Sequence, residues 1–357
     1  MKTSSGPAQP DPPFSNLNRR EALKSLLGMT AALMTPDLLG AVASAAPPAP
    51  PPLDRDRFGE LLPQRKLGRQ GPMVTMLGLG GAHIGFMAHD AMAQKTIEMA
   101  IAGGIRYFDT AAGYAGGQSE VRYGKFLTPK YRDAIFLASK TQSSDADRAR
   151  RDLDISLRRM KTDYLDLWHL HSLHNPGDVN RRIDNGVLDV LLEARQQGKV
   201  RHIGFTGHVT PDSHLHMLAR GAEKGDPFTA CQMPINVLDP SYHSFILNFV
   251  PKAVAAGVGV LAMKTLSNGG FFGRIGGRSV ANPKLIPDRL SVAEALHFVW
   301  SLPVSVLISG PDNPEMLQEK IDLARSCQGM SEQRRQELVL KVADLAGPKI
   351  ESYKVPV

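Results

Sequence analysis

From residue 74 onward, short apolar runs alternate with longer stretches in which apolar residues recur every three or four positions. The short runs are typical of buried strands, and the longer stretches are typical of helices packed against a sheet. This alternation favours a parallel sheet with crossover helices, and a sheet of eight strands can close into a barrel. Strands are predicted over residues 74–79, 105–108, 134–139, 164–170, 200–205, 229–237, 258–263 and 304–308.

The pattern therefore predicts an α/β protein, a (β/α)8 TIM barrel over residues 58–357. A glycine break in the run RKLGRQGPMV predicts an N-terminal β-hairpin before the first strand, and the patterns at 314–326 and 331–345 predict extra C-terminal helices. The connection over 267–289, which contains GGFFGRIGG, is long enough to form a mobile flap over one end of the barrel. The crossover helices are predicted over residues 91–102, 119–127, 145–160, 180–197, 211–223, 243–256 and 292–301.

Three successive predicted strands each bring a titratable side chain to their carboxyl end. Asp109 and Tyr114 follow the strand at 105–108, Lys140 follows the next strand, and His171 follows the one after that. The carboxyl ends of the strands of a parallel barrel share one rim, where such barrels hold their active sites. The simpler alternative is that Asp109 and Lys140 form a structural ion pair, while Tyr114 and His171 only line the rim. For any one of these residues taken alone, this alternative would be preferred. Because they lie at consecutive strand ends, we interpret all four as one reactive site.

The charge and cysteine content of the chain exclude several classes of function. The 357 residues are 42% hydrophobic, which is enough for a large core, and carry a formal net charge of +7. Because the basic residues are mixed with acids, we expect a mild attraction for anions and no nucleic-acid surface. Two cysteines are too few for a disulfide framework, and no Cys/His cluster has metal-ligand spacing, so no metal site is predicted.

The first 46 residues have the order of a cleavable export signal. The motif NRREALK at 18–24 resembles the twin-arginine export motif, and an apolar stretch followed by small residues leads to Ala46. We therefore predict a twin-arginine signal peptide over 1–46, a Pro-rich linker over 47–57, and export to a bacterial periplasm with the twin-arginine translocase as partner. The apolar stretch is shorter than the ~20 residues of a membrane span, so no stable span is expected. The alternatives are an amphipathic N-terminal helix, a membrane anchor, and a cytoplasmic protein in which the paired arginines are incidental.

Several motifs together resemble the aldo-keto reductase superfamily. They are FDTAAGY at 108–114 with Ser119-Glu120 and Gly124 soon after it, ASKT at 138–141, and DYLDLWHLH at 163–171. The similarity runs from Arg65 to the C-terminus. It implies reduction of an aldehyde or ketone to an alcohol by hydride transfer from NAD(P)H, without a metal. It also implies a catalytic tetrad formed by Asp109, Tyr114, Lys140 and His171.

The chemistry of carbonyl reduction explains why these residue types are needed. As hydride reaches the carbonyl carbon, negative charge forms on the oxygen, so a proton donor must lie beside that oxygen. Tyr114 is expected to donate the proton, and the Lys140 cation is expected to lower the pKa of the phenol from about 10. Asp109 is expected to hold the ammonium group in place. His171 is expected to orient the substrate oxygen or to share in proton transfer.

The resemblance also implies positions that contact a nicotinamide cofactor. The turn GFTGH departs from the Ser-Asn that the family carries there, whereas Gln232 in the next strand fits the family pattern. Lys264 and Lys320 are the basic residues available for phosphate groups, and the family favours NADP(H) over NAD(H). The implied cofactor positions are Thr206, Gly207, Gln232, Met263, Lys264, Leu266, Gly310 and Lys320.

The substrate is predicted only as a small carbonyl compound, and no oligomeric state is predicted. His83, in the loop GGAHIGF, and Phe271, in the connection over 267–289, are the candidate substrate contacts. A second function, from a different class, is a barrel that holds its nucleotide without turnover and acts through a protein partner. Export favours this alternative, because free reduced cofactor is not expected to be plentiful outside the cytoplasm. The complete tetrad favours catalysis.

Overall fold

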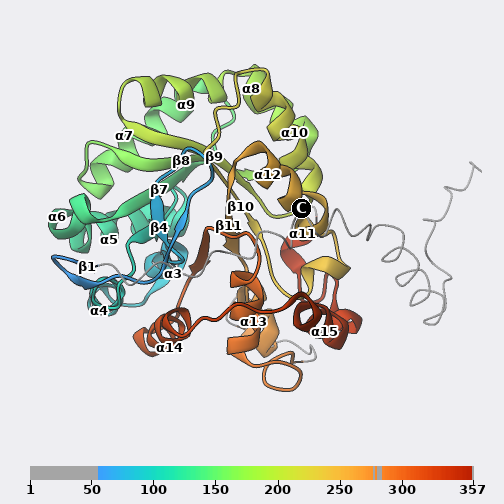
Figure 1. Cartoon of the computed structure of the whole chain (residues 1–357). Coiled ribbons are helices and arrows are strands. Elements are labelled where there is room, and N and C mark those ends of the chain that lie inside the picture. Colours follow the sequence, from blue (N-terminus) through green and yellow to red (C-terminus); the bar gives the residue numbers. More distant parts are fainter. Residues whose placement is uncertain (1–54, 276–277, 280–283, 356–357) are drawn as a thin grey trace, which may run out of the picture. The chain divides into compact units, whose positions relative to one another are not determined.

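The computed structural model of the chain, shown in Figure 1, describes residues 55–275, 278–279 and 284–355. The predicted signal peptide over 1–46 lies outside these residues and stays a prediction. The predicted flap over 267–289 is described only in part.

The described chain begins at β1 (Arg55–Asp56), which pairs antiparallel with β2 (Gly59–Glu60). β1 lies within the range 47–57 that is expected to be linker. These residues are ordered as part of the fold because of an ion pair, in which the Asp56 carboxylate accepts hydrogen bonds of 2.7 and 2.8 Å from the Arg106 guanidinium. Arg106 is buried just before the second barrel strand, so this pair attaches the first described residues to the barrel.

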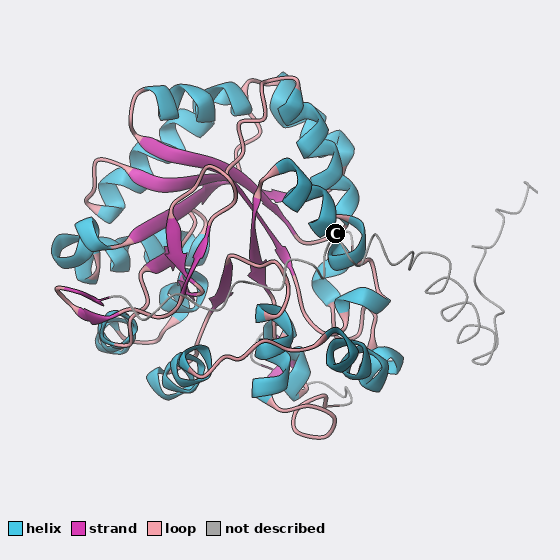
Figure 2. Cartoon of the chain, in the orientation of Figure 1, coloured by secondary structure: helices cyan, strands magenta, loops and turns pink. Residues whose placement is uncertain are grey.

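Eight parallel strands form a closed barrel in which the last strand pairs back with the first (Figure 2). They follow one another around the barrel in chain order. The predicted (β/α)8 barrel is therefore confirmed. The strands are β5 (Leu77–Gly80), β6 (Tyr107–Asp109), β7 (Phe136–Thr141), β8 (Leu165–Leu173), β9 (Val200–Gly207), β10 (Ala230–Pro234), β11 (Gly259–Met263) and β14 (Val306–Ser309).

Helices connect these strands and surround the barrel, as Figure 1 shows. They are α4 (Asp90–Ala102), α5 (Gln118–Phe126), α7 (Ala146–Met160), α8 (Pro176–Asp184), α9 (Val187–Gln196), α10 (Pro211–Ala222), α11 (Phe245–Asn248), α12 (Val250–Ala256), α13 (Val292–Trp300), α14 (Pro314–Arg325) and α15 (Glu332–Val342). The two helical patterns predicted after the last strand are α14 and α15.

Short elements complete the described chain. The short helices and strands are α3 (Gly81–Phe86), α6 (Thr128–Tyr131), β12 (Arg274–Ile275) and β13 (Arg278–Ser279). The 3-10 turns are η1 (Tyr114–Gly117), η2 (Arg132–Ala134), η3 (Asp239–Ser241), η4 (Ser267–Phe272), η5 (Ala343–Leu345) and η6 (Ser352–Lys354).

The first predicted strand, over residues 74–79, is two separate elements. β4 (Met73–Thr75) pairs antiparallel with β3 (Gln64–Lys66) and forms the predicted hairpin, whereas β5 begins only at Leu77. Thr75 makes the change of direction, because its hydroxyl donates to the Leu77 carbonyl at 3.0 Å. The hairpin places Leu67 and Val74 against apolar residues inside the barrel.

Two predicted helices are each divided in two. The prediction of one continuous helix over 180–197 is wrong, because Gly186 has a left-handed backbone with φ 78° and separates α8 from α9. The helix predicted over 243–256 is broken after Asn248, where Pro251 in the first turn of α12 lacks the N–H that a continuous helix would need.

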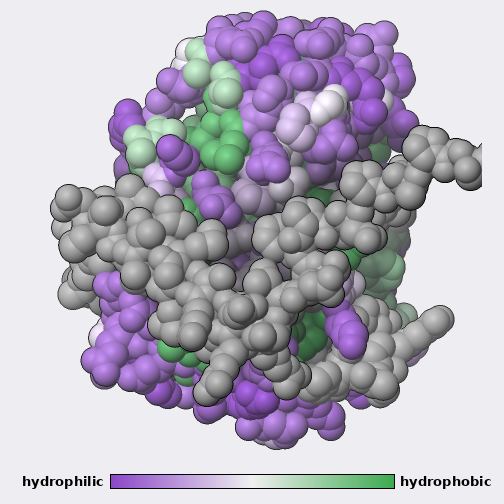
Figure 3. Space-filling view, turned by 90° about the vertical axis from the view of Figure 1, so that its right-hand side faces the viewer, coloured by the Kyte–Doolittle hydropathy of each residue, from purple (hydrophilic) through white to green (hydrophobic). Residues whose placement is uncertain are grey.

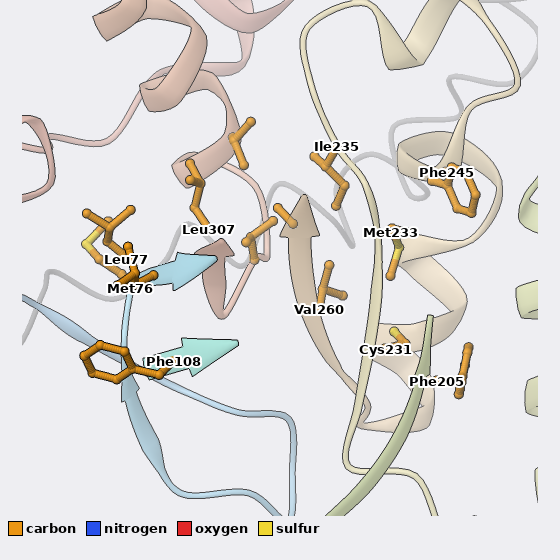
Figure 4. Close-up of a cluster of buried hydrophobic side chains, with 14 of the residues drawn as sticks. Met76, Leu77, Phe108, Phe205, Cys231, Met233, Ile235, Phe245, Val260 and Leu307 are labelled. Atoms are coloured by element: carbon orange, nitrogen blue, oxygen red, sulfur yellow. The ribbon is translucent and has the colours of Figure 1, made fainter. Parts of the chain in front are cut away.

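Hydrophobic side chains fill the space inside the barrel and the space between strands and helices. Along β6, successive side chains alternate, so Tyr107 points inside and Phe108 points toward the helices. Figure 4 shows part of the outer cluster, in which Val260 and Leu307 are also labelled. Burial of each such side chain contributes about 1.5–3 kcal/mol. At the carboxyl ends of β6 to β8, the buried side chains become polar, and this change marks the site.

The described surface is largely hydrophilic on the face shown in Figure 3, where hydrophobic residues form separate areas. Within the described part of the chain, no helix has the length and apolar character needed to cross a bilayer.

Candidate active site

Neighbouring strands bring the four predicted site residues to one end of the barrel. β7 and β8 pair with Lys140 opposite His169, and His171 lies two residues further along the same strand face. Asp109 ends β6, which is the other neighbour of β7. Tyr114 begins η1, which lies shortly after β6. The barrel thus gathers the four side chains from three adjacent strands and one loop.

Lys140 and Asp109 form an ion pair in which both side chains are almost completely buried. The Lys140 ammonium lies 2.6 Å from Asp109 Oδ1, and it donates to Asp109 Oδ2 and to the Thr110 carbonyl at 2.7 Å each. Burial disfavours the charge on Lys140, but its interactions with Asp109 and then Tyr114 outweigh this effect and raise the pKa of the lysine. Lys140 is therefore an ammonium ion at neutral pH.

The Tyr114 hydroxyl faces this ion pair. Its oxygen lies 3.5 Å from the Lys140 nitrogen, and that nitrogen lies 4.9 Å from the centre of the ring. Burial raises the pKa of Tyr114 above its usual value, and Lys140 offsets this rise only in part. Lys140 thus acts on the phenol in the expected direction, but burial is the larger effect and the pKa of Tyr114 is raised overall. Tyr114 keeps its proton throughout the neutral range and is available as a donor.

His171 lies beside Tyr114 and completes the group. The two ring centres are 5.6 Å apart, with the ring planes at 80°. The Arg182 guanidinium donates to the His171 carbonyl at 2.8 Å and holds this end of β8. Burial, and then the positive charge of Lys140, lower the pKa of His171 well below its usual value. The imidazole is therefore neutral and can donate from one nitrogen and accept at the other.

His169 is a further inward-facing histidine, opposite Lys140. It is completely buried, and neither ring nitrogen has a hydrogen-bond partner among the described residues. Burial, and then Lys140, lower the pKa of His169 well below its usual value, so it is neutral as well. It therefore adds no positive charge beneath the ion pair.

The residues implied as contacts for a carboxamide lie at the ends of the next strands. The Thr206 hydroxyl accepts the backbone N–H of Ser172 at 2.8 Å, so it joins β9 to β8. Gly207 leaves no room for a side chain, because an added Cβ would lie 2.7 Å from His214 Cε1. Gln232 is buried on β10, and its Oε1 has no partner within the described structure. Met263, the last residue of β11, is 7% exposed.

Lys264 and Lys320 supply two cations to the same end of the barrel. Lys264 follows β11, and Lys320 is a buried residue of α14. Burial lowers the pKa of Lys264, and it lowers the pKa of Lys320 to about 8. Neither amine has a carboxylate within ion-pair distance among the described side chains, so both can interact with an anion.

His83 lies against the implied cofactor position Gly310. An added Cβ at Gly310 would lie 1.9 Å from His83 Nδ1, and His83 Nε2 lies 3.6 Å from Asp312 Oδ1. Burial is the main cause that lowers the pKa of His83; Asp312 opposes it, while Lys320 and Lys264 add to it. The two lysines, His83 and Gly310 therefore belong to one part of the rim.

Phe271 is built into the hydrophobic core, whereas Leu266 is only partly buried beside it. Phe271 has no exposed surface, and its carbonyl accepts the backbone N–H groups of Leu285 and Ile286 at 3.0 and 2.9 Å. It is therefore not available as a substrate contact in this structure, because the predicted flap folds back onto the core at this point. Leu266 packs partly buried against the same cluster.

His208, which is not among the site residues predicted from the sequence, lies just after β9. Burial, followed by the charge of Lys264, lowers the pKa of His208 to about 3, and His208 in turn acts on the pKa of His171. It is therefore a further neutral imidazole near the mouth of the barrel. A single histidine in a loop belongs to no periodic pattern, so the sequence does not show that His208 lies near the site.

The C-terminal segment holds the turn after β10 through a buried ion cluster. The Lys354 ammonium lies 2.8 Å from Asp239 and 3.0 Å from Glu351, and all three side chains have no exposed surface. The Asn236 amide donates to Glu351 at 3.2 Å and to the Lys264 carbonyl at 3.3 Å. Lys354 follows Asp239 by more than a hundred residues, so no local pattern could predict this contact.

Comparison with known proteins agrees with the motifs in the site. Residues 76–331 match the aldo/keto reductase family. L-galactose dehydrogenase of Arabidopsis thaliana is 29% identical over 224 residues, which cover 57% of this chain and 66% of that protein. The 6-dehydroglucose reductase of Novosphingobium aromaticivorans is 30% identical over 254 residues, which cover 66% of this chain and 76% of that protein. The chain thus spans just under two thirds of the plant relative's length.

A solved structure agrees with the fold. The holo form of an aldo-keto reductase from Bacillus halodurans has a TM-score of 0.66 and 22% identity, and the match covers 82% of this chain and 100% of that chain. At this identity the likeness concerns the barrel alone, whereas the family match extends over most of the chain's length. The chain therefore belongs to the aldo/keto reductase family, whose members are oxidoreductases that act on carbonyl groups.

Proposed function

We propose that this protein reduces an aldehyde or ketone to an alcohol with a nicotinamide cofactor, and that NADPH is preferred to NADH. One observation carries the proposal. The Tyr114 hydroxyl, which keeps its proton at neutral pH, lies 3.5 Å from a buried ammonium ion and next to a neutral imidazole. This arrangement can protonate an oxygen and stabilise the charge that develops on it.

The residues at the rim fit a nicotinamide dinucleotide. The unpaired Oε1 of Gln232 can accept from a carboxamide, and Lys264 and Lys320 can bind phosphate groups. The second buried cation is the reason for the preference for NADPH, which carries an additional phosphate. The bound cofactor would supply the hydride.

The chain's own residues would then handle the proton. His171, as a neutral donor, orients the substrate oxygen toward Tyr114, which releases its proton to that oxygen as negative charge forms there. The Lys140 ammonium stabilises the resulting phenolate, and Asp109 holds the ammonium in place. The apolar lower half of the barrel excludes water from beneath the site and strengthens these interactions.

The names of two relatives suggest the class of carbonyl compound. A dehydrogenase of L-galactose and a reductase of 6-dehydroglucose both act on sugars. We therefore include a dehydro-sugar beside simple aromatic aldehydes in the substrate panel.

The decisive experiment combines binding with turnover. Purified protein is titrated separately with NADPH and NADH, and loss of reduced nicotinamide absorbance is followed after adding p-nitrobenzaldehyde or a dehydro-sugar, for wild type and for Tyr114→Phe. Turnover by wild type and loss of turnover in Tyr114→Phe, with unchanged cofactor binding, support the proposal. Cofactor binding without turnover across the panel would favour the nucleotide-holding barrel that acts through a protein partner.

We also propose that residues 1–46 direct export through the twin-arginine translocase. The support is the NRREALK motif followed by apolar and small residues. The test fuses residues 1–46 to a reporter that must fold before export, with the Arg19 and Arg20 codons changed to lysine in a control fusion. A reporter that stays in the cytoplasm of cells with a working translocase contradicts the proposed periplasmic location.

A further inference from the structure

Tyr114 is carried by a loop with few side chains of its own to hold it. Residues 110–117 read TAAGYAGG, so apart from Tyr114 itself only Thr110 has a side chain larger than a methyl group. Ala115, Gly116 and Gly117 have left-handed φ values of 50°, 65° and 95°. Glycine adopts this conformation freely, whereas alanine adopts it at a cost of roughly 1–2 kcal/mol. The shape of the loop therefore depends on contacts from other elements.

One residue of the loop, Ala112, is held through both its backbone N–H and its carbonyl. The backbone N–H of Ala112 donates to the Lys140 carbonyl at 3.1 Å. The Ala112 carbonyl accepts a hydrogen bond of 3.2 Å from Arg159 Nη1, which reaches it from α7. Because Ala112 lies two residues before Tyr114, these contacts set the position from which the tyrosine side chain projects.

Arg159 is in turn paired with a buried acid. Its Nη1 lies 3.3 Å from Oε2 of Glu120, a residue of α5 with no exposed surface. The other oxygen, Oε1, accepts a hydrogen bond of 2.7 Å from the Ser139 hydroxyl. Ser139 directly precedes Lys140 on β7, so these contacts form a closed circuit from Lys140 through Ser139, Glu120, Arg159 and Ala112 back to Lys140.

Two glycines make room for the circuit. An added Cβ at Gly117 would lie 2.4 Å from Arg159 Cζ, and one at Gly124 would lie 1.9 Å from the Arg159 carbonyl oxygen. Because Gly124 lets α5 and α7 approach closely, the guanidinium can reach both the loop and Glu120. The Glu and Gly that follow the FDTAAGY motif thus have a physical role in placing Arg159.

We propose that Arg159 and Glu120 are positioning residues for carbonyl reduction, which hold the Tyr114 hydroxyl at its distance from Lys140. The inference rests on the proposed function, since it assigns the pair to the proton donor of that reaction. Misplacement of a reacting group by about 1 Å can cost about 100-fold in rate. The cofactor contacts proposed above lie on β10, after β11 and on α14, outside the circuit, so the pair acts on kcat and leaves cofactor affinity unchanged.

The test compares Arg159→Met and Glu120→Gln with Arg150→Met. Arg150 lies on the same helix and forms an exposed ion pair of 2.9 Å with Glu193, so its variant is the matched control. We expect kcat to fall about 10- to 100-fold in Arg159→Met and in Glu120→Gln. We expect the Kd for NADPH to stay within about twofold of wild type, Arg159→Lys to recover part of kcat, and Arg150→Met to behave as wild type.

A double variant separates positioning from a general loss of structure. In the Tyr114→Phe background, Arg159→Met should lower the residual rate by less than about twofold, because the group that it positions is already absent. If Arg159→Met lowers kcat by the same factor in both backgrounds, or leaves kcat at the wild-type value, this inference is overturned while the proposed function stands. If Arg159→Met does not fold, the nearly isosteric Glu120→Gln is crossed with Tyr114→Phe in its place. A wild-type protein that binds cofactor but reduces no carbonyl overturns the proposed function and this inference with it.

Discussion

The ammonium nitrogen of Lys140 lies 3.5 Å from the hydroxyl oxygen of Tyr114. Burial raises the pKa of the phenol, and the ammonium is the group that offsets part of this rise. The relationship between the two residues therefore decides how good an acid Tyr114 is. Lys140 makes it easier for Tyr114 to release its proton, in a buried site that otherwise favours the protonated phenol.

Replacement of Tyr114 by phenylalanine removes the proton donor and keeps the ring. We expect kcat to fall about 100- to 10,000-fold, which is the range typical of a lost general acid. The Kd for NADPH should be unchanged, because the hydroxyl faces Lys140. Tyr164→Phe, which changes a tyrosine packed between Arg132 and Arg201, is the control. Equal activity of the two variants would contradict the assignment.

The rate of reduction should depend on pH through Tyr114. The acid must be protonated to act, so the rate is constant through the neutral range and falls as pH rises through the pKa of Tyr114. Because burial raises this pKa, the midpoint of the fall should lie at higher pH than for an ordinary tyrosine.

Removal of the cation should move this alkaline fall. Without Lys140 the pKa of Tyr114 rises further, so the fall moves to higher pH and the plateau rate drops. Lys140→Met alone would leave Asp109 as an unpaired buried charge, at a cost of about 3–5 kcal/mol. The pH profile of kcat is therefore measured on Lys140→Met combined with Asp109→Asn. Loss of Asp109 removes a smaller effect that raises the pKa of Tyr114, so a net move to higher pH is still expected. A profile that keeps the wild-type midpoint would show that this ion pair as a whole does not set the pKa of Tyr114.

Binding of NADPH should weaken on the alkaline side of neutrality because of Lys320. The pKa of this lysine is about 8 in the free protein, so its charge is present below that pH and is lost above it. We expect the Kd for NADPH to rise by about tenfold as pH increases beyond 8, since a hydrogen bond to a charged group is worth about 1.5–3 kcal/mol.

Fluorescence titrations from neutral to alkaline pH measure this dependence. Lys320→Met should bind weakly at every pH and show no step near 8, whereas Lys320→Arg should bind well throughout, because arginine keeps its charge. If the Kd of Lys320→Met still rises by the same factor near pH 8, another group causes the pH dependence.

Loss of Lys354 should destabilise the barrel more than loss of a surface lysine. Lys354→Met leaves the buried carboxylates of Asp239 and Glu351 without their cation, and we expect a fall of about 3–5 kcal/mol in the free energy of unfolding. Lys224→Met removes an exposed 2.8 Å pair with Asp189 and should cost less than about 1 kcal/mol. Denaturant unfolding measures both values. If the free energy of unfolding falls by a similar amount in the two variants, the buried cluster stabilises the barrel no more than an exposed ion pair does.

The sequence by itself determined the barrel and the four residues of the proposed site. Apolar runs and helical spacing are local properties, and the strands of this barrel follow chain order. The order of the motifs therefore placed Asp109, Lys140 and His171 on neighbouring strands before any contact was known. Breaks such as Gly186 were missed, because a glycine in an amphipathic stretch does not by itself show whether its φ is positive.

The tertiary structure decided everything that depends on burial or on contacts between distant segments. The direction of the Tyr114 pKa shift follows from burial, which outweighs the nearby cation. Phe271 lies in the core because its loop folds back onto the barrel, and Arg159 meets Glu120 because Gly124 allows two helices to approach. Local patterns report which face of an element is apolar, but only the assembled fold sets the desolvation and the distances that govern charge.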